Sequence, residues 1–488
     1  MTSPEHPIAK PNEPQIYKVG TLRYTRGGLL TVIFWLLWGD LFLTFMEAVF
    51  PALIPLQLKW QSASDPVIGL LSNSIPFAIG VLVCPFIGMM SDRHRGRLGR
   101  RRPFLLWSTP CVVLMLSLLG FADKLGPALH AAINSFLPCS QEFTTIVLLG
   151  LFGAGFTFFN QYTMQVYGFL GADVIPQEVY GRMAGLYRAI GVLSSFAFNY
   201  WVYGLAETYL WQIYTGAALL YGIAFMIVIW RVKEGEYPPP DTRHEGLGLW
   251  GSLKLYIRDC CSHRFYILYF SIIMFFWFGT APFWTFVTFY ITSAGGREGN
   301  LGMTLEEFGK IKGWGNLFQI PIFIVLGALA DYVKQPIRLV VWALAAGVVA
   351  FVAGFFFVDS PQSLLLWWML HFGAVAMMLG AANKLPIMFL PRELFGQFSS
   401  AIQVFLSLGM IAGPTLCGWF LQVMGDYRYV FLWGAVFTAL AMVASILTWR
   451  EWLKLGGADS FVAPLPGNSF KNSTTDSSES LQKEGRSP

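Results

Sequence analysis

Two acidic residues stand in an apolar stretch near the beginning of the sequence. Asp40 and Glu47 are seven positions apart in a run rich in Leu, Phe and Trp. In a helix this spacing places both carboxyls on one face, about 10 Å apart. A carboxyl in such a segment is costly unless it faces a cavity or a partner. The pair therefore predicts an internal polar site, with a structural ion pair as the alternative.

Arg188, in a separate apolar stretch, is the natural partner for these acids. Its guanidinium can hold a carboxylate or a group of hydroxyls through several hydrogen bonds. We expect Asp40 to stay ionised beside this cation. Glu47 has apolar neighbours on both sides, which favours the protonated acid, so we expect it to take up and release protons.

The segments that carry these residues belong to an all-α membrane protein. Of the 488 residues, 55% are hydrophobic and only 12% are charged, a composition too apolar for a water-soluble chain of this length. Apolar stretches of about 20 residues, the length that crosses a bilayer, recur along the sequence. Twelve spans are predicted, at 28–52, 66–90, 103–121, 143–169, 181–205, 209–230, 265–291, 307–330, 337–358, 363–389, 396–424 and 427–449.

A basic loop fixes the expected orientation. Residues 88–103 contain six arginines and one acid, so they cannot lie in hydrocarbon and are expected at the cytoplasmic face. With twelve spans, both termini fall on that face of a cell (inner) membrane. The loop at 292–312 is an exception, since Arg297, Lys310 and Lys312 place positive charge on the opposite side.

Two patterns occur once in each half of the chain. G-x-x-x-D at 88–92 recurs at 327–331, 239 residues later, and P-x-E-x-aromatic-G at 176–181 recurs at 391–396, 215 residues later. Two parallel six-span repeats are the architecture of major facilitator transporters, whose substrate site lies between the halves near the midplane. The chain is expected to share that pseudo-symmetric fold.

The predicted organisation has five parts. Two six-helix bundles are separated by a central cytoplasmic loop and flanked by a cytoplasmic N-terminal tail and a disordered C-terminal tail rich in Ser, Lys, Glu and Gly. In chain order their ranges are 1–27, 28–231, 232–264, 265–450 and 451–488.

The repeated motifs and the basic loop form the candidate inner gate. Asp92 is expected near Gly396, and Asp331 near Gly181, because the start of a helix in the opposite half favours an anion. The candidate gating residues are Gly88, Asp92, Arg93, Gly99, Arg100, Arg101, Glu178, Gly327, Asp331 and Glu393.

The same loop carries a resemblance to a known family. Ser91–Arg93 followed by Gly99–Phe104 resembles the loop between the second and third helices of the sucrose-type transporters of plants and animals. With Gly39, Asp40 and Arg188, the chain is also similar to the glycoside-pentoside-hexuronide:cation symporters.

This resemblance implies transport of a sugar, often a disaccharide such as sucrose or maltose, together with a proton or sodium ion. In the melibiose permease branch, an acid of the first helix and an arginine of the fifth hold the sugar. Asp40 and Arg188 match those positions.

Amides are the remaining candidates for binding sugar hydroxyls. Asn160, Gln161 and Gln165 lie on the fourth span at the depth of Asp40, and Gln403 is the repeat counterpart of Arg188. Amides also hold membrane helices together, which is the alternative role. Further amides and possible ring platforms are Asn73, Asn199, Asn316, Gln319, Asn383, Tyr187, Trp277, Trp284 and Trp314.

Departures from the family pattern bear on coupling. Thr157 stands where sucrose transporters carry an aspartate, and the second span lacks the acids that sodium-coupled members use. No sodium site is therefore expected. Proton coupling through Glu47 and Asp40 is predicted, with uncoupled facilitation as an open alternative, and Lys384 and His371 are further possible participants.

Several classes of function are not expected. The sequence has no Cys/His ligand spacing, phosphate-cradling glycine loop or serine elbow, so we expect neither an enzyme nor a metal or cofactor site. Nucleic acid is not an expected partner, because the basic residues lie in loops between spans. The expected partners are a sugar, a proton and the lipid bilayer, and the protein is expected to be a monomer. A lysolipid transporter of the same family and a non-transporting sugar sensor are the alternatives.

Overall fold

The computed structural model describes residues 16–136, 138–236, 260–261, 263–296, 299–332 and 335–465. The side chains of some residues in this part of the chain lie outside the description, among them those of Asp92, Arg93, Asp331 and Glu393.

The first half is a bundle of long helices. A short hairpin of β1 (Tyr17–Val19) and β2 (Leu22–Tyr24) precedes them. The helices are α1 (Arg26–Trp60), α2 (Asp65–Gly69), α3 (Ile75–Arg93), α4 (Arg102–Ile133), α5 (Gln141–Val174), α6 (Gln177–Ala197) and α7 (Ala206–Arg231). A π-helical turn η1 (Leu70–Ser74) joins α2 to α3, and the turns η2 (Phe198–Val202) and η3 (Tyr203–Leu205) join α6 to α7.

The second half repeats this arrangement. Its helices are α9 (Arg264–Ile291), α10 (Leu305–Tyr332), α11 (Pro336–Phe357), α12 (Pro361–Ala382), α13 (Leu385–Phe389), α14 (Phe395–Met424), α15 (Tyr429–Lys454) and α16 (Gly457–Ser460). The short turns η4 (Ser293–Gly295) and η5 (Arg392–Leu394) lie between them.

The helices begin at the side chains that the sequence provides. Thr25, Ser140 and Ser360 accept hydrogen bonds from backbone N–H groups in the first turns of α1, α5 and α12. Such caps satisfy donors that have no partner within the helix. Gly425, with φ of +74°, ends α14 in the left-handed conformation that glycine adopts most readily.

The fold confirms an all-α membrane protein. Ten segments of the described chain are long and apolar enough to cross a membrane. One of these, 177–231, contains both α6 and α7, whereas α10 is not among the ten. The separate crossings of α6, α7 and α10, and with them the count of twelve, stay predictions.

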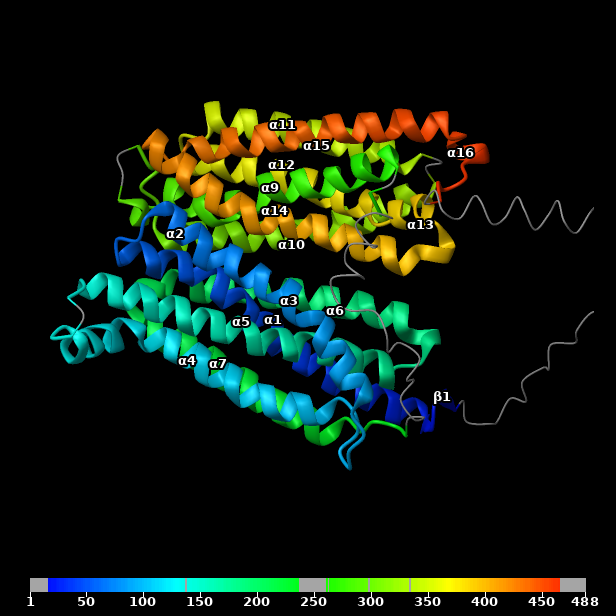
Figure 1. The fold of residues 1–488 in the computed structure, drawn as a ribbon, viewed down its shortest axis with the longest axis horizontal. Helices are drawn as coiled ribbons and strands as arrows, with labels where there is room; N and C mark the ends of the chain where they lie inside the picture. Colours follow the sequence, from blue (N-terminus) through cyan, green and yellow to red (C-terminus); the bar gives the residue numbers. More distant parts are fainter. Residues whose placement is uncertain are drawn as a thin grey trace, which may run out of the picture.

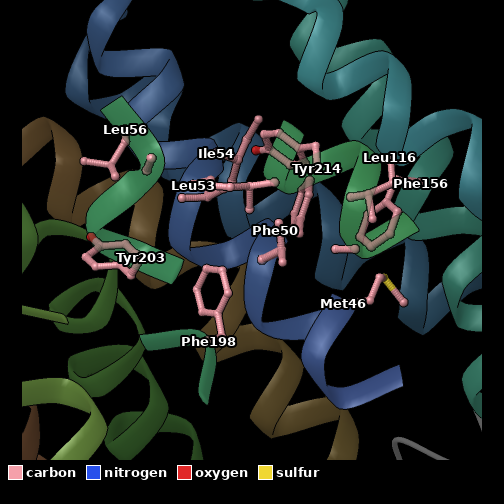
Figure 2. Close-up of a cluster of buried hydrophobic side chains, with 14 of the residues drawn as sticks. Met46, Phe50, Leu53, Ile54, Leu56, Leu116, Phe156, Phe198, Tyr203 and Tyr214 are labelled. Carbon is pink, nitrogen blue, oxygen red and sulfur yellow. The ribbon is translucent and has the colours of Figure 1, made fainter. Parts of the chain in front are cut away.

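The two bundles lie side by side, with β1 and α16 at the same end of the molecule (Figure 1). We call this the arginine end, because the loop before α4 also lies there, and we call the opposite end the far end. Within the first bundle, α1 contributes Met46, Phe50, Leu53 and Ile54 to a buried apolar cluster (Figure 2). Phe50 stacks on Phe156 of α5 with ring centroids 5.0 Å apart, and buried Leu53 and Ile54 follow on α1. This packing fixes α1 against the helices around it.

Two segments differ from the predicted organisation. The stretch 122–142, predicted as a loop, is mostly helix, because α4 continues to Ile133 and α5 begins at Gln141. In the tail predicted as disordered from 451, residues 451–465 pack against the second bundle and include the end of α15 and all of α16. Phe461 packs on Phe265, and the Tyr266 hydroxyl donates to the Pro464 carbonyl at 2.9 Å. Apolar side chains in this short segment explain the packing, which charge composition alone did not indicate.

Candidate substrate-binding site

A cavity of about 660 Å³ lies between α1, α6 and α10. It therefore has walls from both halves of the chain. Asp40, Glu47 and Arg188 all line it, so the structure brings together the three charged residues singled out in the sequence. The other lining residues are Thr44, Ala48, Ala184, Tyr187, Gly191, Val192, Ser195, Asn316 and Gln319.

The α1 wall carries the two acids and Thr44, at positions i, i+4 and i+7 of one helical face. The Thr44 hydroxyl donates to the Asp40 carbonyl oxygen at 2.7 Å. The Oδ2 atom of Asp40 is buried and has no hydrogen-bond partner among the described residues. A bound hydroxyl group would satisfy this acceptor.

Asn160 reaches the site through Glu47. Its Nδ2 donates to Glu47 Oε1 at 3.1 Å, and its Oδ1 is buried without a partner in the described part of the chain. Glu47 thus has a polar contact that its apolar sequence neighbours did not predict.

The α6 and α10 walls supply the remaining polar groups. Arg188 and Ser195 are seven residues apart on α6, and Tyr187 offers the ring predicted as a platform. Asn316 and Gln319 come from α10 in the second half. The sequence named these amides only among many, because nothing in it indicated which helix faces α1.

Three predicted binding residues lie elsewhere. Gln161, Gln165 and Gln403 line a second cavity of about 610 Å³ between α3, α5 and α14. Gln165 Nε2 donates to the Cys84 sulfur, at 3.5 Å. The seven residues predicted to bind the sugar or the proton thus divide between two cavities, with Asn160 donating to Glu47 of the first.

The two cavities are repeat counterparts. Gln403 lies 215 residues after Arg188, and Phe77 and Gly80 lie 239 residues before Asn316 and Gln319. The repeat offsets found in the motifs therefore also relate the walls of these sites. At these three positions the first cavity has a cation and two amides, whereas the second has an amide, a ring and a glycine.

Hydrogen bonds between the halves close the far end. The Tyr427 hydroxyl donates to Asp65 Oδ1 at 2.6 Å, and Lys59 Nζ lies 3.2 Å from the same oxygen. Lys59 also lies over the Tyr427 ring, 5.2 Å from its centroid. Deeper in the interface, Asn73 Nδ2 donates to Thr285 Oγ1 at 2.8 Å.

Close backbone packing supports this closure. A Cβ on Gly69 would meet the Pro414 carbonyl, and one on Gly418 would meet the Asp65 carbonyl. Glycine at both positions lets α2 approach α14 directly. On the other side of the interface, Gly309 of α10 lies equally close to the Asn199 backbone.

The arginine end is open beside α6. Tyr180 and Leu186 are exposed in its first three turns, and a Cβ on Gly181 or Gly185 would meet open space. The described contacts between the halves thus lie at the far end, while the start of α6, which also lines the first cavity, is exposed at the arginine end.

The predicted gating arginines contact their own half in this state. Arg100 binds Asp173 through two hydrogen bonds of 2.6 and 3.1 Å, and Arg101 binds the same carboxylate at 3.0 Å. Arg101, 4% exposed, also donates to the Ser91 hydroxyl and covers the Phe169 ring.

Glu234 completes this cluster. Its carboxylate accepts backbone N–H bonds from Arg100, Arg101 and Arg102 at 2.8 to 3.0 Å, at the start of α4. Gly99 has φ of +99°, and a Cβ there would lie 2.6 Å from the Glu234 carboxyl carbon. Asp173 and Glu234 were not among the predicted site residues, although each is an acid at the end of a span and at the same end of the molecule as the strongly basic loop.

Among the remaining gate residues, the structure describes the side chain of Glu178. Glu178 is exposed in the first turn of α6. The side chains of Asp92, Arg93, Asp331 and Glu393, and the surroundings of Gly88 and Gly327, lie outside the described part of the chain. The gate between Asp92 and α14, and between Asp331 and α6, stays a prediction.

Other polar candidates are placed away from the first cavity. Trp284 packs against Trp368 and Phe372, while Trp314 packs against Phe196. His371 is buried within the second bundle, stacked on Trp367 with ring centroids 4.8 Å apart.

The two-bundle fold with a polar cavity between its halves defines a membrane transporter of the major facilitator type. A family model described as MFS/sugar transport protein matches residues 66–394, and the chain belongs to that family. The sequence-based identification is thereby confirmed, and the resemblance to sucrose-type transporters and cation symporters is consistent with it. The protein is a multi-pass membrane transporter and not an enzyme.

Solved transporter structures share the fold. A bacterial homologue of the human lysosomal transporter Spinster, inward-facing and unoccupied, superposes with a TM-score of 0.64 at 14% identity, covering 88% of this chain and 99% of that one. An inward-facing bacterial homologue of the iron transporter ferroportin gives 0.64 at 15% identity, over 86% and 99%. The nucleoside transporter NupG gives 0.61 at 10% identity, over 86% and 99%.

Proposed function

We propose that this protein carries a sugar, a disaccharide or glucoside such as sucrose or maltose, across the membrane by alternating access coupled to a proton. The observation that supports this most strongly is the first cavity, where Asp40 and Arg188 face Asn316 and Gln319 across the two halves. Its volume of about 660 Å³ falls within the range of small-molecule sites.

The chemistry of the lining suits a polyhydroxylated ligand. Asp40 provides a carboxylate acceptor whose Oδ2 has no partner among the described residues, and Arg188 provides several donors in a fixed plane. The amides of Asn316 and Gln319 both donate and accept, as sugar hydroxyls do. Tyr187 supplies a ring for the C–H face of the sugar.

Coupling is assigned to the acids of α1. Glu47 lines the same cavity as Asp40, so the charge on one carboxyl affects the other and the bound sugar. A protonated Glu47 can still hydrogen-bond the Asn160 amide, because an amide both donates and accepts. The contact is therefore available in both protonation states of Glu47. Arg188 would hold Asp40 ionised for the sugar, leaving Glu47 to carry the proton.

The orientation is part of the proposal. The basic residues of the arginine end support an orientation with this end, and both termini, on the cytoplasmic side of a cell membrane. The structure described above then corresponds to the state that is open to the cytoplasm.

Transport by purified protein tests this function. Proteoliposomes would be given radiolabelled sucrose or maltose with a proton gradient, and a labelled lysolipid in a parallel experiment. We expect sugar to accumulate above its external concentration and the lysolipid not to move. Equilibration without accumulation would indicate a facilitator, lysolipid movement a lipid transporter, and saturable binding without any uptake a sensor.

A further inference from the structure

A basic pocket and an apolar groove adjoin each other on the outer side of α4 and α7. The pocket, about 840 Å³, is formed by the loop before α4 and the segment after α7. The groove, about 560 Å³, runs along the membrane-spanning parts of the same two helices. Neither belongs to the cavities between the two halves.

The pocket is rich in cations. Its lining contains Arg95, Arg97, Arg100, Arg102 and Lys233 against the acids Glu234 and Glu236. The Glu234 carboxylate already accepts three backbone N–H bonds at the start of α4, and Arg100 already binds Asp173. Arg97 and Lys233 have exposed side chains that face solvent or ligand.

The groove is almost entirely apolar. Leu106 and Val113 of α4 form one wall, and Leu219, Ile223 and Trp230 of α7 contribute to the other. Ile223 is 60% exposed and Trp230 is 82% exposed. In a membrane-spanning bundle these exposed positions face hydrocarbon, and a tryptophan at the end of a span suits the headgroup boundary.

The two features form one continuous surface. Arg102 lines the pocket, and Leu106, one helical turn later on α4, lines the groove. On α7, Trp230 lines the groove and Lys233 the pocket. Arg102 Nε donates to the Ile229 carbonyl at 2.6 Å, which ties the two helices together where the features meet.

We propose that this surface is a binding site for an anionic phospholipid, with its headgroup phosphate in the basic pocket and an acyl chain in the groove. Charge complementarity selects an anion, and the hydrocarbon depth of the groove selects a lipid over a soluble anion. Basic pockets beside spanning helices bind anionic headgroups in this way. The site is separate from sugar binding and does not depend on the proposed substrate.

Native mass spectrometry of protein extracted from nanodiscs of defined composition tests the proposal. Nanodiscs would contain either phosphatidylglycerol in phosphatidylcholine or phosphatidylcholine alone. We expect the wild type to retain one phosphatidylglycerol. The double variant Arg97→Gln/Lys233→Gln should bind it about twenty- to thirtyfold more weakly, from roughly a fivefold loss for each basic residue near a membrane surface.

Matched variants distinguish binding at this site from a general effect of positive charge on lipid retention. Arg338→Gln/Arg450→Gln removes two exposed cations at the same end of the second half and should leave retention unchanged. Ile223→Trp fills the groove and should weaken retention, whereas Val349→Trp, at a 64% exposed apolar position of α11, should not.

Three results would overturn the proposal. The first is equal retention of phosphatidylcholine, and the second is equal weakening by the control pair. The third is protection against thermal unfolding by inorganic phosphate alone, matching that by phosphatidylglycerol and unaffected by Ile223→Trp. That last result would assign the pocket to a soluble anion.

Discussion

At the scale of single residues, the first cavity is defined by charges that neighbouring helices hold at one depth. Asp40 and Glu47 share a face of α1, while Arg188 approaches from α6. The amides of α10 give the second half a direct part in the site. A ligand in this cavity would contact both halves, so movement of either half would change its surroundings, as alternating access requires.

The α10 amides provide a prediction about the second half. We expect Asn316→Ala and Gln319→Ala each to weaken sugar binding about two- to tenfold, the effect of losing an uncharged hydrogen bond. Isothermal titration of sucrose or maltose measures the change. Asn300→Ala, at the far end of the same half, is the control, and equal weakening by it would argue against a direct contact.

Glu47 provides a prediction about coupling. Glu47→Gln keeps an amide that can bond Asn160 but cannot carry a proton, so sugar exchange should persist while pH-driven accumulation is lost. Asp40→Asn should lose both, because it also removes the carboxylate that is proposed to bind the sugar. Counterflow and accumulation in proteoliposomes distinguish the two. Accumulation by Glu47→Gln that is driven by a proton gradient alone would place coupling elsewhere.

At the scale of elements, the basic loop connects α4, α5 and α7 through ion pairs and a helix cap. Arg100 and Arg101 bind Asp173 at the end of α5, and Glu234 after α7 caps the start of α4. The loop therefore carries a fixed structure within one half, in addition to the gate predicted for Asp92.

Two substitutions test these contacts of the basic loop. Gly99→Ala should lower the free energy of unfolding by about 1 kcal/mol or more, since alanine disfavours its positive φ and its Cβ would displace Glu234. Glu234→Gln should cost about 0.5–1 kcal/mol by removing an anion from a helix start. Thermal unfolding followed by tryptophan fluorescence measures both. Glu236→Gln, at an exposed acid nearby, should be neutral, and neutrality of Gly99→Ala would show that the loop adapts freely.

The elements show how far the sequence could be interpreted. Apolar length located each long helix, and the seven-residue spacing correctly placed Asp40 and Glu47 on one face. The same reasoning could not determine which helices meet. Gln161 and Gln165 share the depth of Asp40 but face α14, and Asp173 lies 73 residues from its partner Arg100. The depth of a residue in the membrane follows from its position along a span. The helix that its side chain faces depends on the packing of all the helices.

At the scale of the whole molecule, contacts at the far end stabilise one conformation of the protein. Asp65, which is 1% exposed, lies at the boundary of the two halves and accepts hydrogen bonds from the Tyr427 hydroxyl and the Lys59 ammonium. A carboxylate buried with these partners loses both a charge-assisted hydrogen bond and shielding from water when the far end opens. The contact therefore favours the state that is open at the arginine end.

Tyr427→Phe should shift this equilibrium towards the state open at the far end. Losing a hydrogen bond to a charged group costs about 1.5–3 kcal/mol, which corresponds to roughly a ten- to hundredfold change in the ratio of the two conformations. Spin labels at Asn134 and Gln362, one exposed far-end position in each half, should report a larger long-distance population. Tyr429→Phe is the control, and an unchanged distance distribution in Tyr427→Phe would remove Asp65 from the closure.

The proposed function depends on sugar binding in the first cavity through Asp40 and Arg188. Calorimetric titration of sucrose and maltose into wild type and Arg188→Gln tests it most directly, with Arg182→Gln as an exposed control on α6 and Gln403→Ala in the repeat counterpart. We expect Arg188→Gln to stay folded but to lose sugar binding, as Asp40→Asn should. Arg182→Gln should bind like wild type, and Gln403→Ala should be weakened far less than Arg188→Gln. Tight sugar binding by folded Arg188→Gln would contradict the proposed role of Arg188.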